Sequence, residues 1–230
     1  MSTKAVPEPA DVREARDTTR ALLICGILAG PLYVGIGAVE ALARDGFDLT
    51  RHSLSLLSNG DWGWVHSTML VTTGLLTVLG ALGMRRVLRS SGRGTRGAVL
   101  VGIYGLGLVG AGIFRADPAN GFPPGTPEDA SDASWHGILH FMSGGIGFIG
   151  LIAACIIFAR MFSAAGQSKW ALYSATTGVI FLAAFVGIAA GSQQSGAVLT
   201  FVNLSFGVAV VLAWAWVSAM AARLRNRAIA

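Results

Sequence analysis

The feature that most constrains this chain is a series of apolar segments, each about as long as a membrane is thick. A helix needs roughly 20 apolar residues to cross a hydrocarbon core about 30 Å thick. Six segments meet this requirement, and they run over 21–43, 62–84, 97–114, 135–159, 170–191 and 198–222. Little of the chain is left over, so a separate soluble domain is not expected. The sequence therefore predicts an all-α polytopic membrane protein, a bundle of six transmembrane helices.

The composition agrees with a membrane fold. Only 13% of the residues are charged, whereas soluble domains carry about 25%. The chain also holds 31 glycines, and small residues allow membrane helices to pack closely. We divide it into a tail over 1–20, a transmembrane domain over 21–222 and a basic tail over 223–230. The expected outer loops cover 44–61, 115–134 and 192–197.

The basic residues predict the orientation of the chain in the membrane. All lysines and arginines except Arg44, Arg51 and Arg115 fall in the two tails or in the loops after the second and fourth segments. An excess of these residues marks the cytoplasmic side. We therefore expect both termini in the cytoplasm, in a multi-pass protein of the plasma (inner) membrane. The net charge of +5 then indicates contact with membrane lipids and not with nucleic acid.

Tryptophans are expected at the membrane boundaries, where their amphipathic rings favour the headgroup level. Trp62, Trp64 and Trp135 mark the predicted outer boundary. Trp170 and the Trp214–Trp216 pair are interpreted as markers of the inner boundary.

Titratable side chains gather at the predicted outer side. His136 and His140 are four residues apart at the start of the fourth segment, so both imidazoles share one helix face. Two such histidines can bind one metal ion, with a third ligand from Asp117, His52 or His66 and zinc as a suitable divalent metal. These residues could instead make structural contacts. Asp117 precedes Pro118, a pair that often begins a turn.

The first outer loop contains His52, Ser53 and Ser55. A histidine near serines suggests a base and a nucleophile or polar ligand-binding groups. Catalytic groups are arranged in space and not by sequence neighbourhood. The alternative is a loop whose hydroxyls cap a short helix and whose imidazole bonds to another loop.

Glu40 is the acidic residue inside a predicted span, one turn from the outer end. An acid inside a membrane is costly and indicates a functional site by default. It could bind a cation, accept a proton or pair with a histidine. His66 lies about one turn into the second segment, where it could belong to an outer polar pocket. His66 and Asn203 could also serve helix packing alone.

Several motifs together resemble the domain-of-unknown-function family 998, a family of bacterial six-helix membrane proteins. They are Gly30-Pro31, His52-Ser53-Leu54-Ser55, Trp62 with its apolar helix, Ile113-Phe114-x-x-Asp117 and His136-x-x-x-His140. The resemblance covers nearly all of 20–222 and implies an integral membrane protein without an established activity. At the level of fold the family is similar to a six-helix group that includes proteins of lipid remodelling and autophagy.

Two functions follow from these residues. In the first, the outer His/Asp/Glu cluster binds a cation, a lipid headgroup or a small ligand, with Glu40, Ser53, Ser55 and His66 among its binding residues. In the second, a metal ion or a His/Asp pair activates water against a lipid-like substrate, with His52, Asp117, His136 and His140 as catalytic residues. The sequence favours the first function and leaves the oligomeric state open.

Overall fold

A computed structural model describes residues 9–89, 91–128, 133–191 and 195–228 of the chain. Within these ranges the chain forms six helices long and apolar enough to cross a membrane, which confirms the expected all-α membrane fold. They are α1 (Ala10–Ala43), α2 (Gly63–Val87), α3 (Gly92–Ile113), α4 (Trp135–Ala164), α5 (Ser168–Gly191) and α6 (Gly196–Arg227). A short 3₁₀ helix, η1 (Leu54–Ser58), lies between α1 and α2.

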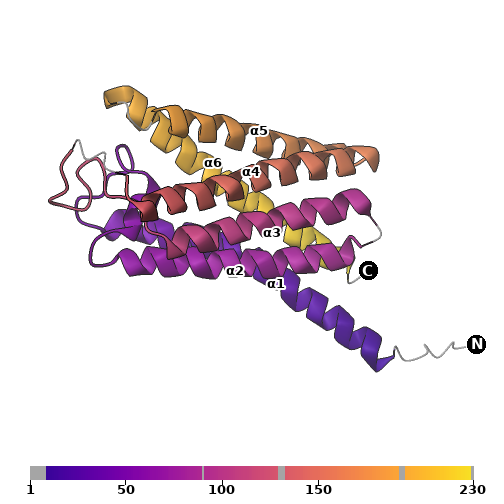
Figure 1. Ribbon diagram of the computed structural model, residues 1–230. Helices are drawn as coiled ribbons and strands as arrows, with labels where there is room; N and C mark the ends of the chain where they lie inside the picture. Colours follow the sequence, from indigo (N-terminus) through magenta and orange to yellow (C-terminus); the bar gives the residue numbers. More distant parts are fainter. Residues whose placement is uncertain (1–8, 90, 129–132, 192–194, 229–230) are drawn as a thin grey trace, which may run out of the picture.

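The contacts between helices follow chain order and close into a ring, with α6 running obliquely behind the other helices (Figure 1). Each one packs against the next along the chain, and α6 returns to pack against α1. Consecutive helices usually lie side by side and antiparallel, which accounts for this order. Side chains directed inward from the ring therefore form its core.

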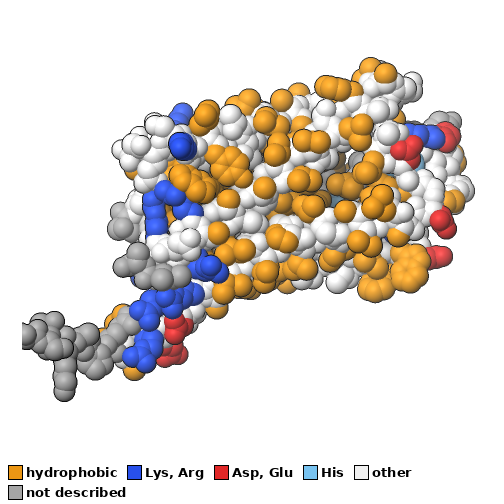
Figure 2. All heavy atoms as spheres, turned by 180° about the vertical axis from the view of Figure 1, so that it is seen from behind, with side chains coloured by type: hydrophobic (Ala, Val, Ile, Leu, Met, Phe, Trp, Pro, Cys, Tyr) orange, Lys and Arg blue, Asp and Glu red, His pale blue; other side chains and the backbone are white. Residues whose placement is uncertain are grey.

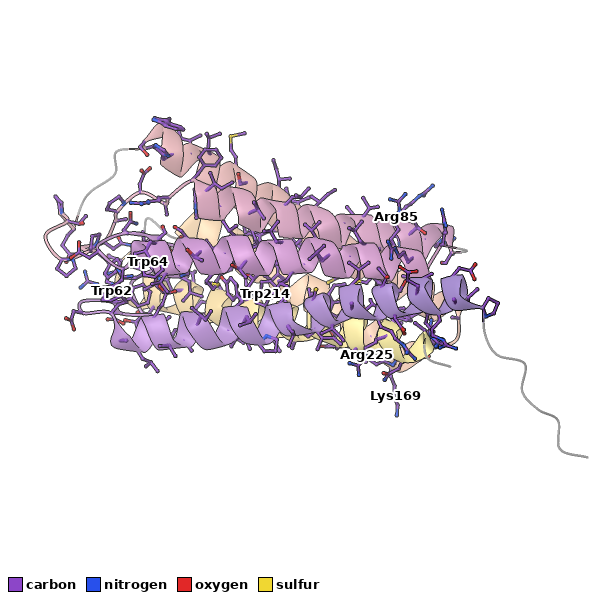
Figure 3. All side chains as sticks on the ribbon, turned by 90° about the horizontal axis from the view of Figure 1, so that it is seen from below. Trp62, Trp64, Arg85, Lys169, Trp214 and Arg225 are labelled. Atoms are coloured by element: carbon purple, nitrogen blue, oxygen red, sulfur yellow. The ribbon has the colours of Figure 1, made fainter. Side chains whose placement is uncertain are left out.

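The two ends of the ring carry different side chains. We call the end that holds both chain termini proximal, and the end that holds the loops after α1 and α3 distal (Figure 1). Arg85, Lys169 and Arg225 lie at the proximal end, opposite Trp62 and Trp64 (Figure 3). Figure 2 shows an apolar flank between the two ends. This distribution matches the expected charge asymmetry, and the orientation in a membrane stays a prediction.

Two helices extend beyond the apolar segments. α1 begins at Ala10 and α6 continues to Arg227, so parts of both predicted tails are helical. Pro31 lies inside α1 without ending it, as membrane helices tolerate. Residues 1–8 and part of the expected loop at 192–197 lie outside the described residues.

Glycines determine how closely neighbouring helices approach. A Cβ on Gly80 would lie 2.6 Å from the Cα of Gly26, and a Cβ on Gly107 would lie 2.6 Å from the Cα of Gly147. A Cβ on Gly30 would meet the carbonyl oxygen of Trp214 at 2.9 Å. Close backbone packing of this kind is a main source of attraction between helices in lipid. Alanine at these positions would force the helices apart.

Trp214 and Trp216 correct one expectation, because both are 0% exposed and lie in the core and not at a membrane boundary. The Trp216 indole N–H donates to the Ser174 hydroxyl at 3.0 Å. The Trp214 ring centroid lies 4.9 Å from that of Tyr33 and 5.4 Å from that of Tyr104. An indole has an apolar body and one polar N–H, so it suits a boundary and a buried aromatic cluster alike. The centre of the helix ring requires such large side chains.

A small second core covers the distal end of α1. It consists of Leu56 and Leu57 from the η1 segment and Phe122 from the loop after α3, all buried. Phe47 packs edge-on against Phe122, with ring centroids 5.3 Å apart. We call these four residues the distal cap. The cap joins the two long distal loops into one unit above the helix ends.

Candidate functional site

A buried carboxylate and a buried imidazole face each other beneath the distal cap. Glu40 lies in the last turn of α1 and His66 in the first turns of α2, and these helix ends meet because α1 and α2 are antiparallel neighbours. The Nδ1 of His66 lies 2.9 Å from Oε2 of Glu40. Glu40 is 6% exposed and His66 is 1% exposed. Both residues were expected in a ligand site, and the structure brings them together.

Arg44 completes this group, one helical turn beyond Glu40. One of its guanidinium nitrogens lies 4.0 Å from Oε1 of Glu40. The guanidinium donates hydrogen bonds to the carbonyl oxygens of Leu57 and Asn59, and its carbon lies 5.5 Å from the ring centroid of Phe122. The sequence reasoning used Arg44 only to assign orientation. The Glu40 to Arg44 spacing of four residues was the signal that could have identified it.

One oxygen of Glu40 lacks a donor. Oε1 is buried and has no hydrogen-bond partner among the described residues. Arg44 attracts it through charge alone at 4.0 Å, since its N–H groups serve the two loop carbonyls. A buried acceptor without a donor costs about 1–3 kcal/mol. An ammonium, a hydroxyl or a cation is the kind of group that would satisfy such an oxygen.

A shallow hollow between α1 and α2 lies beside this group. Its volume is about 160 Å³. The residues that line it come from both helices and are Leu32, Ile36, Trp64, Val65, Thr68, Met69, Thr72 and Thr73. This is close to the roughly 150 Å³ of an apolar cavity that accepts one benzene-sized group. The hollow therefore suits a short apolar group on the flank of the bundle.

His52 joins the two distal loops. Its Nδ1 accepts the backbone N–H of Asp48 at 2.9 Å, and its Nε2 lies 2.9 Å from the carbonyl oxygen of Asn120. The imidazole is therefore neutral, with the proton on Nε2. Its ring lies between Phe47 and Phe122, at centroid distances of 5.4 Å from each. This arrangement uses both nitrogens in structural bonds, as the alternative reading of the loop anticipated.

The serines beside His52 bond within their own loop. The hydroxyls of Ser53 and Ser55 lie 3.1 Å apart. Ser58 donates to the carbonyl oxygen of Ser55 at 2.7 Å and accepts the backbone N–H of Ala116 at 3.3 Å. Their roles as ligand-binding groups stay a prediction.

Asp117 holds the start of α4. Its two carboxylate oxygens accept the backbone N–H and the hydroxyl of Ser134. The Ser134 oxygen in turn accepts the N–H of Gly137 at 3.1 Å. A carboxylate near a helix N-terminus is stabilised by the helix dipole. Asp117 thus ties the long distal loop to α4.

The two α4 histidines differ in environment. His136 is exposed and stacks on Trp135, with ring centroids 3.5 Å apart. His140 is half-buried, and its Nδ1 lies 2.8 Å from the carbonyl oxygen of Ala111 and 2.9 Å from that of Phe114. The Nδ1–H therefore donates to backbone carbonyls at the end of α3.

The expected metal ligands make separate contacts in the structure. Asp117 bonds to Ser134, His136 stacks on Trp135 and His140 bonds to α3. In the described ranges no three histidine, cysteine, aspartate or glutamate side chains form a group that could hold a metal ion. A zinc site at Asp117, His136 and His140, and the hydrolase that would depend on it, stay predictions.

The distal loop also contains a perturbed acid. The Thr50 hydroxyl and backbone N–H donate to Asp48 at 2.7 Å and 2.8 Å. These bonds hold the pKa of Asp48 below its ordinary value of 3.8. Asp48 is exposed, so this shift reflects local loop structure and not a buried catalytic group.

Comparison with known proteins gives one match. The family model described as "Protein of unknown function (DUF998)" matches residues 27–223. No curated protein and no solved structure matches the chain.

Proposed function

The chain belongs to the family of proteins of unknown function DUF998, and we propose that it binds a small amine or an amine-bearing lipid headgroup at its distal end. Glu40 anchors the ligand, His66 orients the carboxylate and Arg44 joins the group to the distal cap. The observation that carries the proposal is the buried Oε1 of Glu40, which has no donor within the described part of the chain.

An ammonium group fits this oxygen better than a bare metal ion. It supplies N–H donors and a positive charge, so its bond to a carboxylate is charge-assisted. A divalent cation needs several oxygen or nitrogen ligands. Arg44, whose guanidinium lies 4.0 Å from Oε1 of Glu40, repels a doubly charged ion more strongly than a singly charged ammonium. The proposal also takes the distal end as extracytoplasmic, which the proximal arginines support.

Thermal unfolding in lipid nanodiscs tests the proposal, with ethanolammonium chloride as the probe. A ligand at 100 times its Kd stabilises the folded state by about 2.7 kcal/mol. For a chain of this size that corresponds to a rise in Tm of roughly 5–11 °C. We expect this rise in the wild type and its loss in Glu40→Gln.

Glu128→Gln is the matched control, because Glu128 is an exposed acid of the distal loops that pairs with Arg51. It should retain the ethanolammonium effect. Zinc or magnesium chloride in place of the amine addresses the metal alternative. A Glu40-dependent rise in Tm with zinc and none with ethanolammonium would contradict the proposal.

A further inference from the structure

The inside of the helix ring contains open space in its distal half. A Cβ built on Gly37, Gly144 or Gly207 would meet no atom of another described segment within 4 Å. These glycines come from α1, α4 and α6. Gly37 is buried although nothing fills the space in front of it. At Gly80 and Gly107, by contrast, the backbone of a neighbouring helix lies 2.6 Å from such a Cβ.

All three glycines lie on inward faces of their helices. Gly37 stands between Tyr33 and Glu40, at spacings of three and four residues that share one helix face. The Tyr33 ring packs on Trp214 of α6, so this face of α1 is directed into the ring.

The same spacing holds on the other two helices. Gly207 lies four residues after Asn203 and seven before Trp214, and Gly144 lies four residues from Phe148. The Phe148 ring centroid is 5.6 Å from that of Phe206 and 6.4 Å from that of Tyr104. The open positions on α4 and α6 therefore lie on the helix faces that carry aromatic side chains packed in the core.

Three buried polar atoms on these faces need partners. They are Oε1 of Glu40, Nδ2 of Asn203 and the indole Nε1 of Trp214, for which the described chain supplies no hydrogen bond. Glu40 is 6% exposed, Asn203 is 8% exposed and Trp214 is 0% exposed. Two of these atoms are donors and one is an acceptor. A ligand that forms hydrogen bonds with all three atoms therefore carries both a donor and an acceptor.

The helix geometry gives the depth of this space. Tyr33 packs against Trp214, and Glu40 lies seven residues along α1 from Tyr33. At 1.5 Å per residue the floor at Trp214 is about 10 Å below Glu40. Aromatic rings close the floor, and Glu40 lies at the distal rim.

We infer that the helix ring encloses a chamber, lined by Gly37, Gly144, Gly207, Asn203 and Trp214, that holds a small organic ligand with an ether or carbonyl oxygen at its inner end. The oxygen accepts the Trp214 indole N–H. This inference rests on the proposed function for the outer end of the ligand, where an amine or hydroxyl meets Glu40.

Cysteine accessibility tests the chamber directly. Gly37, Gly144 and Gly207 are each changed to Cys in a protein whose native Cys25 and Cys155 are Ala. The reagent is 2-aminoethyl methanethiosulfonate, a small ammonium, added to the protein in nanodiscs. Gly35→Cys is the matched control, because Gly35 is exposed on the flank of α1, two residues from Gly37. We expect rapid labelling at the inward positions and slow labelling at Gly35→Cys.

The ligand class is tested by protection of Gly207→Cys. The competitors are 2-(2-methoxyethoxy)ethylamine and heptylamine, which have equal chain length and differ in two ether oxygens. One hydrogen bond predicts roughly 2- to 10-fold stronger protection by the ether amine. Trp214→Phe, which removes the N–H, should abolish the difference. Equal protection by both amines, or an unchanged difference in Trp214→Phe, overturns the assignment of the inner end.

The outcomes separate this inference from the proposed function. Labelling of the inward cysteines no faster than Gly35→Cys overturns the chamber, whatever Glu40 binds. Fast labelling by 2-aminoethyl and 2-sulfonatoethyl methanethiosulfonate at equal rates supports the chamber and contradicts the Glu40 anchor. If the chamber and the Glu40 anchor are both correct, the cationic reagent labels the inward cysteines faster than the anionic reagent, by roughly tenfold or more. Glu40→Gln removes that preference.

Discussion

Replacing Glu40 by Gln and by Ala distinguishes a ligand anchor from a structural ion pair. Alanine leaves the buried His66 N–H without its acceptor, at a cost of about 1–3 kcal/mol. It also removes buried side-chain volume, which adds about 2 kcal/mol. We expect Glu40→Ala to lower the free energy of unfolding by roughly 3–5 kcal/mol, as for the broken half of a buried pair.

Glutamine keeps an acceptor for His66 in nearly the same shape. The Glu40→Gln variant loses about 1 kcal/mol because its bond to His66 is no longer charge-assisted. The neutral amide nitrogen then replaces the donorless charged oxygen, and burying it in place of a charge offsets about 1 kcal/mol. Glu40→Gln should therefore unfold at a temperature close to that of the wild type, without added ligand.

Thermal unfolding of the nanodisc-embedded protein, followed by tryptophan fluorescence, measures both variants. A gap of about 3 kcal/mol between them corresponds to roughly 6–12 °C in Tm. Glu14→Gln, an exposed acid of the same helix, is the control for loss of charge. If Glu40→Gln fell as far as Glu40→Ala, the ion pair with Arg44 would hold the fold, and Glu40 would not be free to bind.

Other residues at the distal end give further expectations. His52→Phe removes two loop bonds and should cost about 1–3 kcal/mol; unchanged hydrogen exchange in both distal loops would contradict this role. Asp117→Ala removes the acceptor of Ser134 and should cost about 1 kcal/mol of stability, with faster amide hydrogen exchange in the first turn of α4. Exchange equal to that of the wild type would exclude a capping role for Asp117. The pKa of Asp48 is lowered in the folded protein, so its stabilisation is complete above its ordinary value of 3.8 and is lost as the pH falls through the lowered folded value. Thr50→Val should weaken this acid dependence of loop exchange, and an unchanged pH profile would show that the Thr50 bonds do not cause it.

The helices and their number could be predicted because each apolar segment must satisfy its backbone internally in a membrane. The burial of Trp214 in the core could not be predicted, because an indole suits both a membrane boundary and a buried core. Its burial follows from the closing contact of α6 with α1 at Gly30, where the backbones nearly touch. Such a contact between distant parts of the chain leaves no pattern in either helix.

The candidate site could be predicted only in part, again because contacts between distant segments leave no pattern in the sequence. Glu40 stood out because acids inside membrane spans are rare. His66 was weighed as a packing residue, and its bond to Glu40 depends on the register of α1 against α2. His52, Asp117 and His140 carry the residue types of a metal site, and in the structure each also bonds to a backbone group of another segment. Residue types and spacing do not tell which carbonyl or N–H lies nearest in space.

The most direct test of the account is a contact between the bound amine and Glu40. Solid-state NMR with ¹⁵N-labelled ethanolammonium and ¹³C-labelled protein in lipid measures it through nitrogen–carbon dipolar coupling. We predict a cross-peak between the ammonium nitrogen and the side-chain carboxyl carbon of Glu40, absent in Glu40→Gln. A cross-peak at Glu128 alone, or none at any carboxyl carbon with the amine in excess, would contradict the proposal that Glu40 is the anchor.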